Sequence, residues 1–146
     1  MLGLWASPNN SVTGRLLATL LGQDAVNGRV AVTDPLLLWA GGDDFIDARD
    51  VAAANVAALD AAALPSRVYT IGSGQLASFG DFVAAAGQVR PELVFDEVAL
   101  PDTGFAGFPY RRTQSFDVSC ARAELGFAAR HDLRASFSAA SARVSP

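Results

Sequence analysis

Residues 67–86 read RVYTIGSGQLASFGDFVAAA. Arg67–Ile71 is rich in β-branched and aromatic residues, which predicts a strand. Gly72 and Gly74 then predict a turn. Ser78 and Asp81 stand three residues apart, as in a capping box, and predict the start of a helix with an apolar face. A strand, a turn and a helix in this order indicate an α/β unit.

The same alternation continues on both sides of this stretch. Further strands are predicted at Arg29–Thr33 and Leu93–Phe95. Helices are predicted after Ser11 as far as Gly22, from Asp50 as N-cap to about Ala63, over Val118–Leu125, and after Asp132. In the second of these helices Ala52, Val56, Leu59 and Ala63 share one face. We therefore predict a single α/β domain over residues 1–146, with a small mixed sheet and flanking helices.

The composition excludes several classes of function. All 11 basic residues are arginines, so a Schiff-base lysine, a P-loop lysine and a catalytic Tyr/Lys pair are absent from the chain. These arginines are scattered and the net charge is −4, which argues against nucleic-acid binding. Cys120 and His131 are single, so neither a disulfide nor a His/Cys zinc site is expected, and we expect His131 at a surface or loop position.

A membrane span and a secretory signal are not expected either. The longest apolar stretches, Leu16–Leu21 and Leu36–Ala40, are far shorter than the roughly 20 residues that cross a bilayer. The amino terminus lacks the early positive charge of a signal peptide. We therefore expect a cytoplasmic protein.

The glycine turn supports two readings. Gly72–Ala77 matches the G-x-G-x-x-G/A fingerprint, and Asp96 lies 22 residues beyond Gly74, as in a dinucleotide-binding site. However, the helix begins at its own cap, Ser78, after the glycines, whereas in the fingerprint the helix amino terminus faces the phosphates. The alternative is a plain turn between strand and helix, with no cofactor.

Four segments, taken in order, resemble one family. Residues 44–52, DFIDARDVA, are similar to the "RDFIHVDDVA" segment of NAD-dependent epimerases and dehydratases, which are extended short-chain dehydrogenases. Residues 68–74, VYTIGSG, resemble their "VYNIGSG", and residues 78–83 match the helix start that follows it. Residues 117–127, DVSCARAELGF, resemble "D.skAreeLGf". The order and spacing fit from about Asp43 to Val144, whereas residues 1–42 fit more loosely.

The resemblance implies a substrate-binding lobe, often for a nucleotide sugar, that is the carboxy-terminal half of such an enzyme. The family's Rossmann domain supplies the NAD or NADP site and a Tyr-x-x-x-Lys pair. Neither is present here: Tyr69 is followed four residues later by Ser73, and Tyr110 by Gln114. We therefore expect no catalytic residue, no metal and no cofactor in this chain alone. The expected partners are a small-molecule ligand and either a separate Rossmann chain or further copies of this chain.

The same resemblance gives candidate substrate-binding residues. Arg111 and Arg112 lie near the position of an arginine that pairs with substrate phosphate in the family, and a guanidinium fork suits pyrophosphate. Phe105 lies on the Gly/Pro-rich loop that precedes them, and Arg49 is a further candidate. Asp43, in contrast, stands where many members carry another phosphate-pairing arginine, and it would repel a phosphate.

Three functions remain open on the sequence. The first is a truncated or split epimerase/dehydratase-like protein that supplies the substrate lobe and is inactive alone. The second is a noncatalytic binding module derived from that lobe. The third is a small dinucleotide binder that uses Gly72–Ala77.

Overall fold

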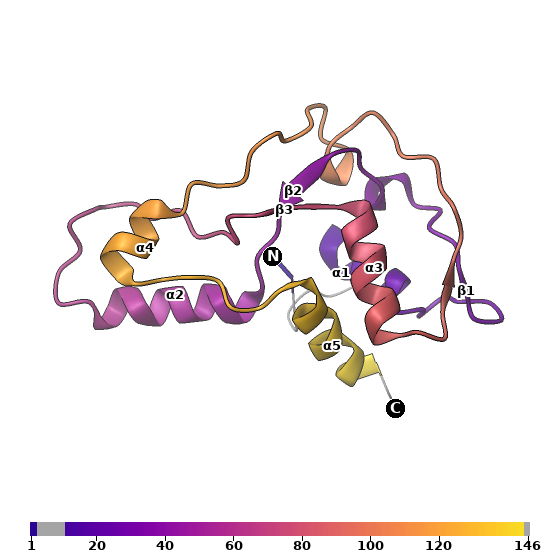
Figure 1. Ribbon diagram of the computed structural model, residues 1–146, viewed down its shortest axis with the longest axis horizontal. Coiled ribbons are helices and arrows are strands. Elements are labelled where there is room, and N and C mark those ends of the chain that lie inside the picture. Colours follow the sequence, from indigo (N-terminus) through magenta and orange to yellow (C-terminus); the bar gives the residue numbers. More distant parts are fainter. Residues whose placement is uncertain (3–10, 145–146) are drawn as a thin grey trace.

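The computed structural model describes residues 1–2 and 11–144 and shows an α/β fold. The helices are α1 (Val12–Leu20), α2 (Ala48–Asp60), α3 (Phe79–Val89), α4 (Ser119–Leu125) and α5 (Leu133–Val144), with short 3₁₀ turns at Pro35–Leu37 and Phe105–Gly107. The strands are β1 (Arg29–Val30), β2 (Gly42–Asp44), β3 (Leu76–Ser78) and β4 (Val94–Phe95). The predicted α/β class with small strands of both orientations is confirmed (Figure 1).

The strands form two separate pairs within the described residues. β1 runs parallel to β4, with Arg29 opposite Val94 and Val30 opposite Phe95. β2 runs antiparallel to β3, with Gly42 opposite Ser78 and Asp44 opposite Leu76. Each pair is only two or three residues long, so side-chain packing rather than an extended sheet must supply most of the stability.

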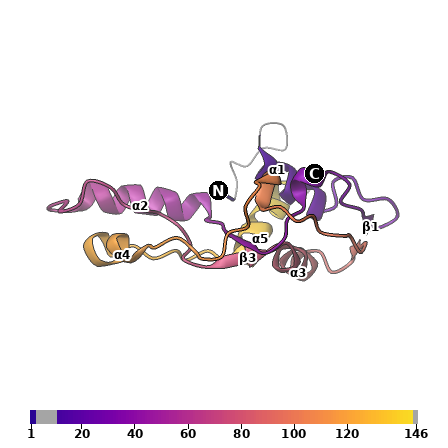
Figure 2. The same cartoon turned by 90° about the horizontal axis from the view of Figure 1, so that it is seen from above.

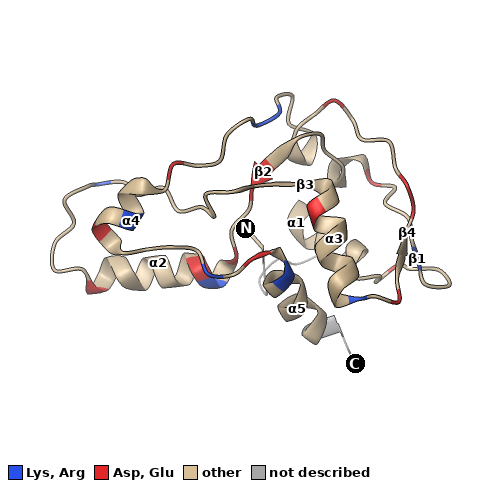
Figure 3. Ribbon diagram, in the orientation of Figure 1, with Lys and Arg blue, Asp and Glu red and all other residues tan. Residues whose placement is uncertain are grey.

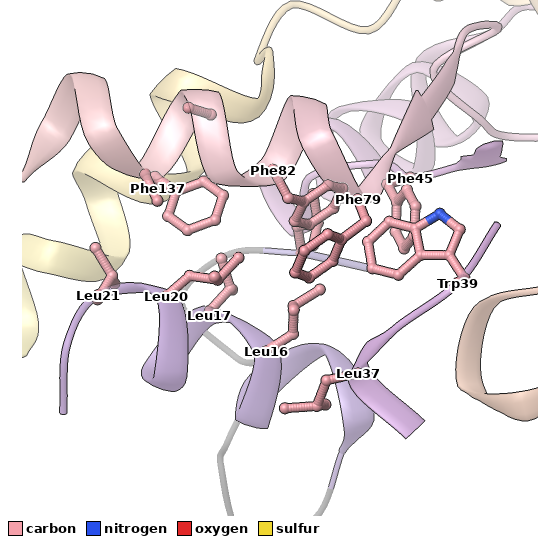
Figure 4. Close-up of a cluster of buried hydrophobic side chains, with 13 residues drawn as sticks. Leu16, Leu17, Leu20, Leu21, Leu37, Trp39, Phe45, Phe79, Phe82 and Phe137 are labelled. Atoms are coloured by element: carbon pink, nitrogen blue, oxygen red, sulfur yellow. The ribbon is translucent and has the colours of Figure 1, made fainter. Parts of the chain in front are cut away.

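The main hydrophobic core lies between α1, α3 and α5. Leucines of α1 face Phe79 and Phe82 of α3, and Phe137 of α5 closes the group (Figure 4). Trp39 is fully buried at one end, where its ring contacts Phe45, Phe79, Phe82 and Phe105 at centroid distances of 5.2 to 5.7 Å. The tilted and edge-to-face arrangements are those that aromatic pairs favour.

Most predicted helix ends are confirmed, because their signals are local. Ser11 caps α1, and Ser78 and Asp81 form the predicted capping box at the start of α3. The hydrogen bonds from Ser78 hold the pKa of Asp81 below its usual value. Gly126 ends α4 in the left-handed conformation, with φ of 63°. Gly87, a residue type that often ends helices, lies inside α3, which continues to Val89.

The start of α2 differs from the prediction. Asp47, not Asp50, is the N-cap, and its side chain accepts a hydrogen bond from the backbone of Arg49. Asp50 lies inside the first turn, almost fully buried, where its carboxylate accepts hydrogen bonds from the backbone and ring of His131. Both aspartates precede the same apolar run, so a local capping rule does not distinguish them. Asp47 contacts Ser136 of α5, and Asp50 contacts His131 in the loop before α5.

Part of the chain projects away from the main core as an arm, formed by residues 48–72 and 117–130. Figures 1 and 2 show α2 and α4 side by side in this arm, at a distance from α1 and α3. Its own core is small, with Ala54, Ala121 and Phe127 buried. Tyr69 donates a 2.7 Å hydrogen bond to Glu124 of α4, and this bond lowers the pKa of Glu124.

Two predictions for the arm are wrong. Arg67–Ile71 is not a strand, because no strand of the described residues pairs with it. The predicted apolar face of α2 is not buried either: Val56 is 55% exposed and Leu59 is 85% exposed. Both segments have the sequence pattern of an interior element. Tyr69 and Ile71 do pack on the arm core, but no described strand pairs with their segment, and Val56 and Leu59 remain exposed.

Candidate functional site

Three of the predicted substrate-binding residues lie around one cavity. This cavity, which we call the arginine pocket, has a volume of about 440 Å³. Its lining residues are Gly42, Asp43, Gly104, Phe105, Phe108, Tyr110, Arg111 and Arg112. The structure thus brings Phe105, Arg111 and Arg112 together with Asp43, although Asp43 lies 62 positions or more before the others in sequence.

The loop before the arginines is closed tightly by backbone contacts. Gly104 donates a 2.7 Å hydrogen bond to the carbonyl of Phe108, and Ala40 donates one of 2.9 Å to the carbonyl of Thr103. A Cβ atom on Gly104 would overlap the carbonyl oxygen of Tyr110, so only glycine allows this close approach. Gly42 forms an isolated bridge with Arg112, which fixes the arginine segment beside β2.

Aromatic side chains line one part of the pocket. Phe105 joins the pocket to the core, because its ring packs on Trp39 at 5.2 Å and on Phe45 at 4.9 Å. Phe108 and Tyr110 are 64% and 76% exposed, respectively. Exposed aromatic faces of this kind are suited to stacking on a planar ring.

Each arginine of the pocket already has a carboxylate partner. Arg112 donates from Nε to Oδ1 of Asp43 at 2.6 Å, and its guanidinium lies 4.4 Å from the ring centre of Phe116. Arg111 pairs with the exposed Asp102 at 3.1 Å. Such surface pairs contribute roughly 0–1 kcal/mol, so a well-placed anion can replace the carboxylates. Figure 3 shows the same interleaving of acidic and basic residues along the rest of the described chain.

Arg49 does not join this pocket. Its guanidinium pairs with Asp47 through two contacts of 2.8 and 2.9 Å and donates to the carbonyl of Ala135 in α5. Asp47 in turn accepts a 2.6 Å hydrogen bond from the hydroxyl of Ser136. Arg49 therefore links α2 to α5, and its predicted role in substrate binding is not supported by its position.

The glycine turn is occupied by a carboxylate of this chain. Ser73 and Gly74 donate their backbone N–H groups to Asp44 at 2.8 and 3.0 Å, and the hydroxyl of Ser73 donates to it as well. The strand β3 separates the turn from α3. Asp96 pairs with Arg29 of β1. The structure thus does not bring Gly72, Gly74 and Asp96 together as a dinucleotide site.

Two features of the site region were missed by the sequence reasoning. Tyr110 lines the arginine pocket, and the only available signal was an aromatic residue next to the two arginines. The contact between Asp50 and His131 joins residues that are 81 positions apart, so no rule of sequence spacing predicts it. His131 does lie in a loop, as expected, directly before α5.

The described residues form neither a metal-binding cluster nor a membrane-spanning helix. Across residues 1–2 and 11–144, no three His, Cys, Asp or Glu side chains gather into a metal-binding group. Within the same residues, no helix has the length and apolarity needed to cross a bilayer.

No family model and no curated protein sequence matches the chain. Solved structures, in contrast, share its fold. RMD from Pseudomonas aeruginosa, complexed with NADPH, has a TM-score of 0.64 at 16% identity, and the match covers 97% of this chain and 43% of that one. UDP-glucose 4-epimerase from Thermotoga maritima, with UDP-glucose, has a TM-score of 0.59 at 16% identity, covering 97% and 42%.

A third structure, ADP-L-glycero-D-manno-heptose-6-epimerase from Helicobacter pylori, gives a TM-score of 0.58 at 20% identity and covers 89% of this chain and 36% of that one. The chain thus spans about two fifths of the length of these proteins. It has the fold of part of an extended short-chain dehydrogenase of the epimerase/dehydratase type.

Proposed function

We propose that the chain is the substrate-binding lobe of a split or truncated NAD(P)-dependent epimerase/dehydratase, and that it takes a nucleotide-sugar-like ligand in the arginine pocket. The observation that carries this proposal is the convergence of Phe105, Arg111 and Arg112 on one cavity, in the fold of part of such enzymes. The solved neighbours include an epimerase with bound UDP-glucose. The pocket combines what a nucleoside diphosphate requires: guanidinium groups for the phosphates and aromatic faces for the base.

The proposal predicts opposite effects for two changes in the pocket. Arg111→Gln together with Arg112→Gln should weaken UDP binding about tenfold or more, because charge-assisted hydrogen bonds to phosphate are lost. Asp43→Asn should strengthen binding several-fold, because it removes the carboxylate that holds Arg112. Isothermal titration with UDP measures both effects.

Arg122→Gln is the matched control, because Arg122 is an exposed arginine of α4 outside the pocket. Its UDP affinity should equal that of the unchanged chain. Equal losses in the double variant and in this control would mean that UDP responds only to overall charge, and the pocket assignment would then be wrong.

The arm supports the second part of the proposal, a Rossmann-type partner chain that carries the cofactor. We define the arm face by four exposed apolar residues: Val56, Leu59, Leu64 and Val68, which are 55%, 85%, 50% and 80% exposed. Val68 belongs to the segment Arg67–Ile71, which has no strand partner among the described residues. Exposed apolar groups together with an unpaired extended segment are typical of a surface that another element covers.

This surface has a measurable consequence in the isolated chain. The arm face should bind the hydrophobic dye ANS, and the double change Leu59→Glu and Val68→Glu should remove most of the dye fluorescence, because two charges then replace apolar contact surface. Leu100→Glu is the control, since Leu100 is also exposed, at 48%, but lies outside the arm. A weak dye signal that the arm changes leave intact would argue against a covered face.

Hydride transfer is assigned to the partner and not to this chain. With no lysine, the chain has no ammonium group to help a tyrosine exchange a proton, so NAD or NADP would be bound and used only in the completed enzyme. Co-expression with a separate chain that carries a Rossmann domain tests this division directly. Cofactor-dependent turnover of a UDP-sugar by the pair, lost with the Leu59→Glu and Val68→Glu changes, is the expected result.

A noncatalytic binding module is the second candidate, and one observation favours it. Asp43 neutralises Arg112 in the pocket at 2.6 Å, a contact that an enzyme handling a diphosphate does not need. In that case the chain would bind its ligand or further copies of itself, and no Rossmann protein would restore turnover. Light scattering separates self-association from a monomer of 15.2 kDa.

A further inference from the structure

A second cavity lies between α3, α5 and the loop that leads into α5. It has a volume of about 510 Å³, and none of its lining residues lines the arginine pocket. We call it the His131 hollow. Apolar side chains from several elements line it, among them Phe45, Leu76, Ala85 and Leu133. His131 is part of the lining.

The His131 ring is held in place by a buried carboxylate. Its Nδ1 lies 2.8 Å from Oδ1 of Asp50, and its backbone N–H donates to Oδ2 of the same residue at 3.0 Å. The side chain of Asp50 is 2% exposed, whereas that of His131 remains 31% exposed. Within the described residues Nε2 has no partner, so Asp50 fixes the ring and leaves this nitrogen available to a ligand.

The carboxylates around the hollow are hydrogen-bonded within the chain, whereas its two arginines have no ion-pair partner among the described residues. Asp81 and Asp132 line it, but both carboxylates already accept hydrogen bonds at the starts of α3 and α5. The Asp50 carboxylate is hydrogen-bonded to the backbone and ring of His131. Arg130 and Arg134 also line the hollow and are exposed, and neither forms an ion pair with any described residue.

From this geometry we propose that the His131 hollow binds a small organic acid. The carboxylate of the ligand pairs with Arg130 and Arg134 at the rim and lies against the His131 ring, and its apolar part lies on Phe45 and Leu133. Asp50 acts as a positioning residue, since its carboxylate fixes the orientation of that ring. The site is independent of the substrate-lobe proposal, because it shares no residue with the arginine pocket or the arm face.

The test uses three probes and the single histidine of the chain as a reporter. Phenylacetate carries both a carboxylate and an apolar ring, acetate only the carboxylate, and 2-phenylethanol only the ring. Phenylacetate should shift the ring ¹⁵N signals of His131 and move the amide signals of Ala85 and Leu133. Acetate and 2-phenylethanol should each bind at least about tenfold more weakly, because each lacks one of the two contacts.

Variants separate this site from general affinity for acids. His131→Gln should weaken phenylacetate binding about tenfold or more, read from the amides of Ala85 and Leu133, and Glu97→Gln should leave it unchanged. Arg130→Gln with Arg134→Gln should weaken it in a fully folded chain. Equal binding to His131→Gln, equal binding of 2-phenylethanol, or first shifts at Arg111 and Arg112 would each overturn the proposal.

Discussion

Trp39→Ala is expected to lower the free energy of unfolding by about 3–5 kcal/mol, the usual cost of removing a large buried aromatic side chain. The indole is fully buried and contacts four phenylalanine rings from three separate parts of the chain. Small domains are stable by only about 5–15 kcal/mol, so the loss would remove a large share of the free energy of unfolding. Urea denaturation followed by far-ultraviolet circular dichroism measures it.

Two further variants make this prediction specific. Phe108→Ala, at an exposed aromatic position, should change the unfolding free energy by less than about 0.5 kcal/mol. Trp39→Phe should cost clearly less than Trp39→Ala, because it keeps ring contacts and removes an indole N–H that has no hydrogen-bond partner among the described residues. A loss below about 1 kcal/mol for Trp39→Ala would show that this aromatic group is not the centre of the core.

Asp47→Ala is expected to cost a similar amount, about 3–5 kcal/mol, because it breaks a buried ion pair and removes the N-cap of α2. The Asp47 side chain is 0% exposed and contacts both Arg49 and Ser136. Its loss would leave the Arg49 guanidinium without its carboxylate and would remove the hydrogen bond from Ser136 of α5. Asp24→Ala, at an exposed position, is the control and should be nearly neutral.

The lowered pKa of Asp47 predicts that the free energy of unfolding depends on pH. Burial opposes its ionisation, but hydrogen bonds from Arg49 and Ser136 outweigh burial and lower the pKa of Asp47 from 3.8 to about 2. A pKa lowered on folding stabilises the folded state above the unfolded value, and this contribution, roughly 2 kcal/mol, is lost as the pH falls from about 4 to 2. In Asp47→Ala this step should be missing from the unfolding free energy measured between pH 5 and pH 2. A step of equal size in both proteins would contradict the assignment.

The features that were predicted correctly from the sequence depend on neighbouring residues. The capping box of Ser78 and Asp81 and the end of α4 at Gly126 are local, and both are confirmed. Arg67–Ile71 has the composition of a strand, but a strand needs a partner, and no described residue supplies one. The face of α2 that carries Leu59 was patterned as an interior surface and is exposed for the same reason.

The candidate site was predictable only in part. Phe105, Arg111 and Arg112 came from a resemblance in the order of motifs, and the fold brings them together. Arg49 was predicted from the same resemblance, but its guanidinium pairs with the carboxylate of Asp47 and does not line the pocket. The contact of Asp50 with His131 depends on how α2 and α5 pack, and sequence spacing holds no information about that distance.

One experiment tests the substrate-lobe proposal most directly: ¹⁵N-labelled chain is titrated with UDP-glucose and, separately, with NADH. We predict that UDP-glucose moves the amide signals of Gly104, Arg111 and Arg112 in a saturable way, and that NADH leaves the signals of Ser73 and Gly74 unchanged. The opposite pattern, saturable NADH shifts at Ser73 and Gly74 with no response of the arginine pocket to UDP-glucose, would contradict it.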